Sequence, residues 1–146
     1  MLFDLIVIGG GAAGFFSAIT CAENSAKSVL ILEKTPQLLQ KVKISGGGRC
    51  NVTHHCFEPR ALSRNYPRGE KALIGPFHRF GAADTVDWFA SRGVTLKTEA
   101  DGRMFPDTDS SQTIIDALLG AADAAGVNIH ASEGVISVVK NEDIFE

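Results

Sequence analysis

The sequence has few of the features that mark secreted or disordered proteins. It contains only three cysteines, an odd number that does not suggest a framework of disulfide bonds. Charged residues make up 21% of the 146 residues and hydrophobic residues 45%, which excludes an intrinsically disordered chain. These values predict one globular domain in a reducing, cytoplasmic environment.

No run of positive charge stands out. The formal net charge is −3, and the basic residues are scattered along the sequence. Proteins that bind nucleic acids or anionic membranes concentrate positive charge on one surface. The sequence therefore predicts no nucleic-acid partner and no membrane partner.

Residues 5–22 contain no charged side chain, as in a membrane span or a signal peptide. Three consecutive glycines interrupt this stretch, however, and Asp4 stands where a signal peptide would have basic residues. Glu23 closes the stretch without a stop-transfer pattern. We interpret it as a buried strand that leads into a buried helix.

The first 34 residues have the pattern of a βαβ unit. Residues 3–8 are apolar and β-branched, as expected for a parallel strand that is covered on both faces. Residues 12–26 carry apolar side chains at helical spacing, and 28–33 form a second apolar strand. The pattern predicts an α/β fold with a parallel sheet core, beginning with a βαβ unit over 3–34.

A glycine fingerprint lies at the first turn of this unit. Gly9-x-Gly11-x-x-Gly14 directly follows the first strand and opens the helix. Gly9 would permit the tight turn, Gly11 would let the backbone approach a pyrophosphate, and Gly14 would let the helix pack closely on the strand. Glu33 ends the second strand 19 residues after Gly14, where a carboxylate would accept hydrogen bonds from a ribose. The fingerprint predicts a dinucleotide site, and Glu33 disfavours NADP there because it would repel the 2′-phosphate.

A long excursion over 35–109 follows, and a helix and strands fill 110–140. Within the excursion, Asp84 is expected to be the N-cap of a helix that reaches Arg92. The other expected elements are strands at 94–98 and 103–105, a helix at 111–125, and strands at 127–130 and 135–139.

A second glycine loop, Ser45-Gly46-Gly47-Gly48-Arg49-Cys50-Asn51, lies inside the excursion. Consecutive glycines expose backbone N–H groups and favour anion binding. Arg49 adds a cation whose planar donors suit a phosphate or a flavin carbonyl.

Four segments together resemble the bacterial aminoacetone-oxidase-like flavoproteins. These segments are 8–14, 32–34, 41–51 and Gly102-Arg103-Met104-Phe105-Pro106. Members of that family are FAD-dependent, NAD(P)H-linked oxidoreductases, and some relatives act in bile-acid metabolism. The resemblance implies a Rossmann-like FAD/NAD(P)-binding domain, as in two-dinucleotide-binding-domain flavoproteins, that acts on a small-molecule substrate.

The resemblance also implies which residues bind FAD. The first glycine turn would contact the pyrophosphate, Glu33 the adenosine ribose, residues 45–51 the flavin half, and Val135 the adenine through its backbone. The candidate cofactor-binding residues are Gly9, Gly11, Ala12, Ala13, Gly14, Glu33, Lys34, Lys41, Ser45, Gly46, Gly47, Arg49, Cys50, Asn51 and Val135. No residue is assigned as a catalytic acid or base.

The chain departs from the family pattern at two positions. Leu39 stands where the family usually has a glycine, and His54 stands where an asparagine is common. The family continues with a β-meander and a substrate domain. We therefore expect residues 1–146 to lack the C-terminal part of the fold and to be inactive or weakly active alone.

Other interpretations of the sequence remain open. Five residues intervene between Cys50 and Cys56, one more than between the redox cysteines of flavin disulfide reductases, so unpaired structural cysteines are expected. Cys50, Cys56 and the two intervening histidines match no standard zinc spacing, and Trp88 is expected in the core. Arg103 could contact a ligand or solvent. The rival functions are a non-catalytic dinucleotide-binding module and an NAD-dependent dehydrogenase domain.

Overall fold

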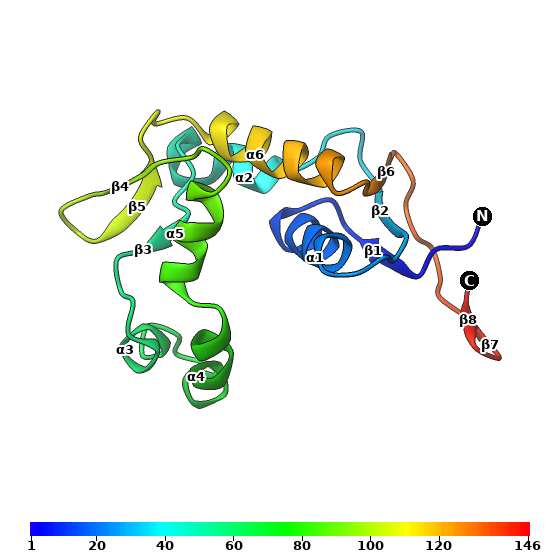
Figure 1. Ribbon diagram of the computed structural model, residues 1–146, viewed down its shortest axis with the longest axis horizontal. Coiled ribbons are helices and arrows are strands. Elements are labelled where there is room, and N and C mark those ends of the chain that lie inside the picture. Colours follow the sequence, from blue (N-terminus) through cyan, green and yellow to red (C-terminus); the bar gives the residue numbers. More distant parts are fainter. The chain divides into compact units, whose positions relative to one another are not determined.

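The computed structural model describes residues 1–146, which divide into two compact units (Figure 1). The first unit comprises Met1–Val42 and Leu118–Glu146, and the second comprises Lys43–Ala117. Helix α6 (Ser111–Ala124) belongs to both units, because the boundary falls between residues 117 and 118. Every helix is too short or too polar to cross a lipid bilayer.

The first unit is built on a parallel three-stranded sheet. The strands are β1 (Leu5–Ile8), β2 (Val29–Glu33) and β6 (Asn128–Ala131), in the order β1-β2-β6. Helix α1 (Ala12–Glu23) connects β1 to β2 and packs against both strands. The predicted βαβ unit and the parallel core are therefore confirmed.

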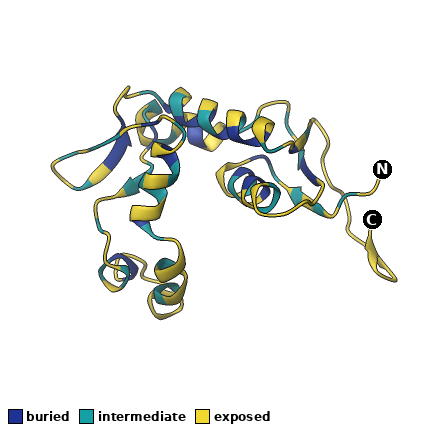
Figure 2. Cartoon of the chain, viewed as in Figure 1, coloured by how far each residue is buried: buried dark blue, intermediate teal, exposed yellow.

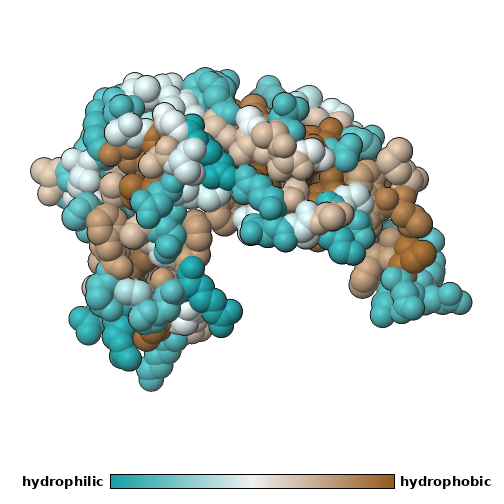
Figure 3. Space-filling model, in the orientation of Figure 1, coloured by the Kyte–Doolittle hydropathy of each residue, from teal (hydrophilic) through white to brown (hydrophobic).

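Burial differs between the two strands that the βαβ unit supplies (Figure 2). Val29, Leu30 and Ile31 of the central strand β2 are buried, as a continuous apolar run predicts. The edge strand β1 is covered on one side only, because Ile6 is 45% and Ile8 60% exposed. The expectation of cover on both faces was thus wrong for β1, and apolar residues of the first unit reach the surface (Figure 3).

The segment after β6 does not form the predicted strand at 135–139. Ser132 has a φ of +62°, which turns the chain away after β6, and residues 133–139 have no regular structure. Regular pairing starts only where Val139 and Glu146 exchange backbone hydrogen bonds at 2.8 and 2.9 Å. The hairpin β7 (Lys140–Asn141) and β8 (Ile144–Phe145) follows from there. The apolar run at 135–139 lacked a partner strand, and a strand requires one.

The second unit combines short helices with an antiparallel sheet. The strands are β3 (Thr53–His54), β4 (Leu96–Thr98) and β5 (Arg103–Pro106), in the order β3-β5-β4. The central strand β5 buries Met104, Phe105 and Pro106. The helical elements are α2 (Gln40–Ile44, which begins in the first unit), η1 (Ser45–Gly48), α3 (Pro59–Ser63), α4 (Glu70–Arg79) and α5 (Ala82–Ala90).

Two helices of the second unit differ from the prediction. Helix α5 begins at Ala82 with Gly81 as its N-cap, so Asp84 is not the N-cap. Asp84 lies in the first turn, and its Oδ2 accepts a hydrogen bond of 2.7 Å from the Gly81 N–H, which stabilises the same helix end from inside. Helix α4 was not predicted, because Pro76 lies inside it and none of its residues is buried.

Asp4 connects the starts of β1 and β2. Its Oδ2 accepts hydrogen bonds of 2.8 Å from both the backbone N–H and the hydroxyl of Ser28, and its Oδ1 contacts Lys27 Nζ at 3.0 Å. The backbone N–H of Ser28 is the main cause that lowers the pKa of Asp4 from 3.8 to about 2, with smaller contributions from the Ser28 hydroxyl and Lys27. A lowered carboxyl pKa stabilises the fold above the unfolded value and ceases to do so as the pH falls through the folded value.

We predict that Asp4→Asn lowers the melting temperature at neutral pH and lowers it less near pH 2, where Asp4 is protonated in the unfolded chain and about half protonated in the folded protein. Thermal melts across this pH range test the prediction. Lys27→Gln is the control, because an ion pair with side chains 60% and 40% exposed contributes little. An equal loss for Asp4→Asn at both pH values would contradict the linkage.

Candidate dinucleotide-binding site

The three fingerprint glycines meet different requirements in the turn between β1 and α1. Gly9 has a φ of +108°, which L side chains rarely adopt. A Cβ on Gly14 would lie 2.0 Å from the carbonyl oxygen of Gly9, so only glycine lets α1 pack this closely on the strand. A Cβ on Gly11 would meet no atom within 4 Å, so the protein itself does not require glycine there. The space beside Gly11 remains available to a ligand.

The N-terminus of α1 faces this turn without a capping side chain. Gly11 is the N-cap and supplies no side-chain acceptor, and the first turn of the helix contains no acidic residue. The N–H groups of Ala12, Ala13 and Gly14 therefore lie in the first turn without the intrahelical partners that later residues have. Such a helix end attracts an anion through its N–H groups and its dipole.

Glu33 ties the end of β2 to the glycine turn. Its Oε2 accepts a hydrogen bond of 2.8 Å from the Gly10 N–H, and its Oε1 accepts bonds of 2.8 and 2.9 Å from the N–H and hydroxyl of Thr35. The Gly10 bond is the main cause that lowers the pKa of Glu33. A carboxylate offers about four acceptor positions, so Glu33 can hold the turn and still accept one bond from a ribose.

Leu39 shows why a glycine is common at its position in the resembled family. Its φ is +55°, a conformation that favours glycine, and its N–H donates a 2.9 Å hydrogen bond to the Gly10 carbonyl. The side chain is only 1% exposed, so apolar burial offsets the strained backbone. This departure therefore leaves the glycine turn intact.

The remaining candidates of the first unit lie at the surface. Lys34 and Lys41 are exposed. Val135 is 38% exposed and lines, with Ile6 and Ile8 of β1, a hollow of about 650 Å³. The strand expected to carry Val135 is absent, and the contact of its backbone with adenine stays a prediction.

In the second unit, the glycine loop adopts a tight left-handed path. Gly46, Gly47 and Gly48 have φ values of +56°, +68° and +86°, and the Cys50 N–H closes the loop by a 3.0 Å bond to the Ser45 carbonyl. A Cβ on Gly46 would lie 2.8 Å from both the Phe105 ring and the Asn51 nitrogen, so packing requires that glycine. Around Gly47 and Gly48 there is open space.

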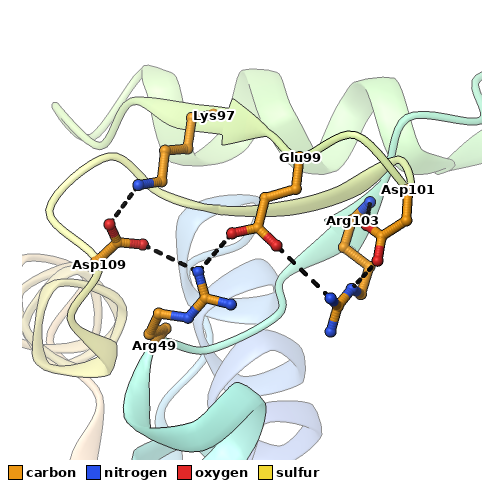
Figure 4. Close-up of polar contacts among 6 residues, drawn as sticks. All are labelled: Arg49, Lys97, Glu99, Asp101, Arg103 and Asp109. Carbon is orange, nitrogen blue, oxygen red and sulfur yellow. Dashed lines mark hydrogen bonds and ion pairs between the residues drawn. The ribbon is translucent and has the colours of Figure 1, made fainter.

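Arg49 is held by acidic residues that the sequence analysis did not identify (Figure 4). Its Nη1 lies 2.5 Å from Glu99 Oε1 and 3.3 Å from Asp109 Oδ1, and its guanidinium stacks 4.0 Å from the centre of the Phe105 ring. The hydrogen bond to Glu99 is the main cause that raises the pKa of Arg49. Arg49 was expected to be available to a phosphate or a flavin carbonyl, but one of its nitrogens is committed to these carboxylates.

The same cluster extends along the β4–β5 hairpin (Figure 4). Lys97 pairs with Asp109, and Arg103 contacts Asp101 Oδ2 at 2.7 Å and Glu99 Oε2 at 3.6 Å. Arg103 is therefore an ion-paired strand residue. The excess of acidic residues around the two predicted strands was the sequence signal that could have revealed the cluster.

The other motif residues have structural surroundings. The three cysteines are free thiols, and burial raises the pKa of the Cys50 thiol. A Cβ on Gly102 would lie 2.3 Å from the ring of His54, which packs over this glycine. The Arg92 guanidinium covers one face of the Trp88 ring at 3.7 Å. No group of three or more histidine, cysteine or acidic residues is arranged to hold a metal ion.

Comparison with known families identifies the chain. The family model of the HI0933-like protein Rossmann domain matches residues 3–146. The chain belongs to this family. Its fold class is the α/β Rossmann-like FAD-binding fold with a parallel sheet core, as predicted from the glycine turn and the apolar strands.

Among curated relatives, the ribosomal RNA dihydrouridine synthase of Escherichia coli K12 is 34% identical over 143 residues, which cover 98% of this chain and 34% of that protein. The 3-dehydro-bile acid delta(4,6)-reductase of Clostridium scindens is 29% identical over 113 residues, 77% of this chain and 27% of the reductase. The chain thus spans between about a quarter and a third of the length of these relatives.

Solved structures show the same fold. A flavocytochrome c3 fumarate reductase in its open conformation matches with a TM-score of 0.71 and 23% identity, over 97% of this chain and 28% of that chain. The 3-ketosteroid-delta4-(5alpha)-dehydrogenase of Rhodococcus jostii RHA1 matches with a TM-score of 0.71 and 16% identity, over 96% of this chain and 40% of that chain. At these identities the likeness concerns the fold alone.

We predict that Gly14→Ala destabilises the fold by about 1–3 kcal/mol, because the new methyl group would overlap the Gly9 carbonyl. Gly120→Ala is the matched control, since Gly120 lies in α6 with open space around it and should gain stability from helix propensity. Thermal denaturation of both variants measures the opposite shifts. A Gly14→Ala protein as stable as the unmodified chain would show that the close approach is not required.

Proposed function

We propose that this chain binds FAD and is the FAD-binding part of an oxidoreductase. The observation that carries the proposal is the turn at Gly9–Gly14, where a glycine without steric need in the protein, Gly11, stands at the uncapped N-terminus of α1. A pyrophosphate needs close access to such a backbone and to the N–H groups of the helix. Family membership and fold support the same assignment.

The residues of the first unit fit the ADP half of the cofactor. The N–H groups of Ala12, Ala13 and Gly14 would bind the pyrophosphate, and Glu33 would accept a hydrogen bond from the adenosine ribose. Glu33 would repel a 2′-phosphate, which favours FAD or NAD over NADP at this position. Lys34 and Lys41, both exposed, would add positive charge for the phosphates.

For the flavin half we propose the loop of the second unit, Ser45–Asn51. Its open backbone at Gly47 would contact the flavin, and Arg49 would be held in one orientation by its carboxylate partners. When bound, FAD would supply the two-electron chemistry. Cys50 would act through packing, since its thiol is buried and the pKa is raised.

The electron donor, the kind of substrate and the cellular location are further parts of this proposal. We propose NAD(P)H as the electron donor, a small molecule as the substrate and the cytoplasm as the location, in line with the resemblance to the aminoacetone-oxidase-like flavoproteins. The names of the relatives support a reaction class: a dihydrouridine synthase, a delta(4,6)-reductase and a fumarate reductase all suggest addition of two electrons and two protons to an unsaturated bond.

A second candidate substrate is the uracil ring of an RNA. Two relatives, from Escherichia coli and Haemophilus influenzae, are called ribosomal RNA dihydrouridine synthases and are 34% and 31% identical to this chain. The absence of a nucleic-acid partner, predicted from scattered basic residues, remains a prediction. Steady-state assays of the whole protein with free enones and with uridine-containing RNA distinguish the two candidates.

We predict that Gly11→Val abolishes FAD binding without unfolding the chain. Gly11 has φ −92° and ψ −178°, extended backbone that valine adopts readily, and no protein atom lies near its Cβ position. The valine side chain would instead occupy the space of the pyrophosphate. The measurement is flavin absorbance that stays with the protein after gel filtration with excess FAD.

Gly120→Val is the control, an exposed helical glycine that should not affect FAD. Full FAD affinity in Gly11→Val would show that the turn is wrongly assigned. A colourless unmodified chain that binds NAD would instead favour a dehydrogenase domain.

We predict that Glu33→Ala weakens FAD at least tenfold, because one charge-assisted hydrogen bond to the ribose contributes roughly 1.5–3 kcal/mol. The variant also releases the Gly10 N–H, so its melting temperature is measured alongside a fluorescence titration of FAD. Thr35→Val removes the bonds of the Thr35 hydroxyl to Glu33 and to the Gln37 carbonyl and controls for looser packing around the carboxylate. An unchanged dissociation constant in Glu33→Ala would remove Glu33 from the site.

A further inference from the structure

Helices α3 and α4 and their flanks carry a dense group of positive charge. Residues 58–79 contain five basic residues and two acidic ones, although the net charge of the chain is −3. The prediction of no nucleic-acid partner assumed scattered basic residues, and this segment departs from that assumption. The five basic residues are Arg60, Arg64, Arg68, Lys71 and Arg79.

These five side chains are exposed, and none lies within ion-pair distance of a carboxylate. The Arg60 N–H is the main cause that lowers the pKa of Glu58, and the charges of Arg60 and Arg64 contribute less. The cations near the β4–β5 hairpin behave differently, because Arg49, Lys97 and Arg103 all contact carboxylates. Of the two acidic residues in the segment, Glu58 accepts two backbone N–H groups at the N-cap of α3. The unpaired cations are therefore available to a polyanion, whose phosphates would replace small counterions.

Exposed aromatic rings accompany these charges. Phe57, Tyr66 and Phe80 are 44%, 42% and 39% exposed. Phe57 contacts the His55 ring at 4.4 Å and Tyr66 the Phe77 ring at 5.4 Å between ring centres, and the exposed part of each ring remains accessible. Figure 3 shows the hydrophilic surface of α3 and α4 with less polar residues among it. Exposed rings between cations are typical of surfaces that stack on unpaired bases of a single strand.

A hollow of about 420 Å³ opens beside these rings, lined by Tyr66 and Phe80 and by residues of the β3 region. The hydroxyl groups of Thr53 and Tyr66 also line it, and neither makes a hydrogen bond within the protein. Two hydroxyls without partners can bond to the edge of a base. The hollow therefore combines stacking surfaces with free donors and acceptors.

We propose that the α3–α4 face of the second unit, together with this hollow, binds a single-stranded polynucleotide. The arginines contact phosphates, the exposed rings stack on bases, and the polar side chains of the hollow bond to base edges. An acidic protein would also attract the cations, but it offers no series of flat bases for Tyr66 and Phe80. The proposal extends the RNA candidate of the proposed function, but the binding does not depend on FAD, so its failure and a failure of FAD binding are measured separately.

The test is fluorescence anisotropy of the 146-residue chain without FAD, using labelled oligouridylate of about 12 nucleotides. We expect the affinity to fall with salt. The triple variant Arg60→Gln, Arg64→Gln, Arg68→Gln should reduce the slope of log K against log salt by about 2, since each phosphate contact on a single strand contributes roughly 0.7. Tyr66→Ala should weaken binding about tenfold, and Tyr66→Phe should weaken it less.

Lys140→Gln is the matched control, because Lys140 is an exposed cation of the first unit. Oligothymidylate separates RNA from DNA, and tight binding of either strand with the expected variant effects supports the proposal. Melting temperatures show whether each variant is folded. No binding at low salt, equal binding of polyglutamate, or a folded triple variant with an unchanged slope would overturn the proposal.

Discussion

The architecture of the first unit depends on one steric constraint, the 2.0 Å that would separate a Cβ at Gly14 from the Gly9 carbonyl oxygen. Because no side chain intervenes, α1 lies against the strand that precedes it, and its N-terminus is presented at the end of the sheet. The hydrogen bond from the Gly10 N–H to Glu33 then holds β2 to the same turn. The candidate pyrophosphate and ribose contacts are thus consequences of backbone proximity.

Close packing at a glycine also shapes the second unit. Gly46 lets the loop pass against Phe105, and Arg49 lies over the same ring, where Glu99 and Asp109 neutralise its charge. The motif around Gly102 is explained in the same way, since His54 occupies the space that a side chain there would need. Several residues that looked like ligand contacts therefore have a packing role that can coexist with binding.

Local patterns in the sequence predicted the βαβ unit well, because a continuous apolar strand, a glycine turn and an amphipathic helix are each encoded within a few residues. Features that need distant partners were predicted poorly. The apolar run at 135–139 had no strand to pair with, and the carboxylates around Arg49 come from residues 50 and 60 positions away. Helix α4 was not predicted, because Pro76 lies inside it and because none of its residues is buried.

The uneven placement of charge has a consequence for how the protein behaves in solution. Eight of the 14 basic residues, but only two of the 17 acidic ones, lie between positions 41 and 79. At its isoelectric point of about 5.8 the chain is therefore neutral in sum, but this segment keeps an excess of positive charge. Positive segments of one molecule attract acidic segments of another at low ionic strength, so moderate salt should increase the solubility.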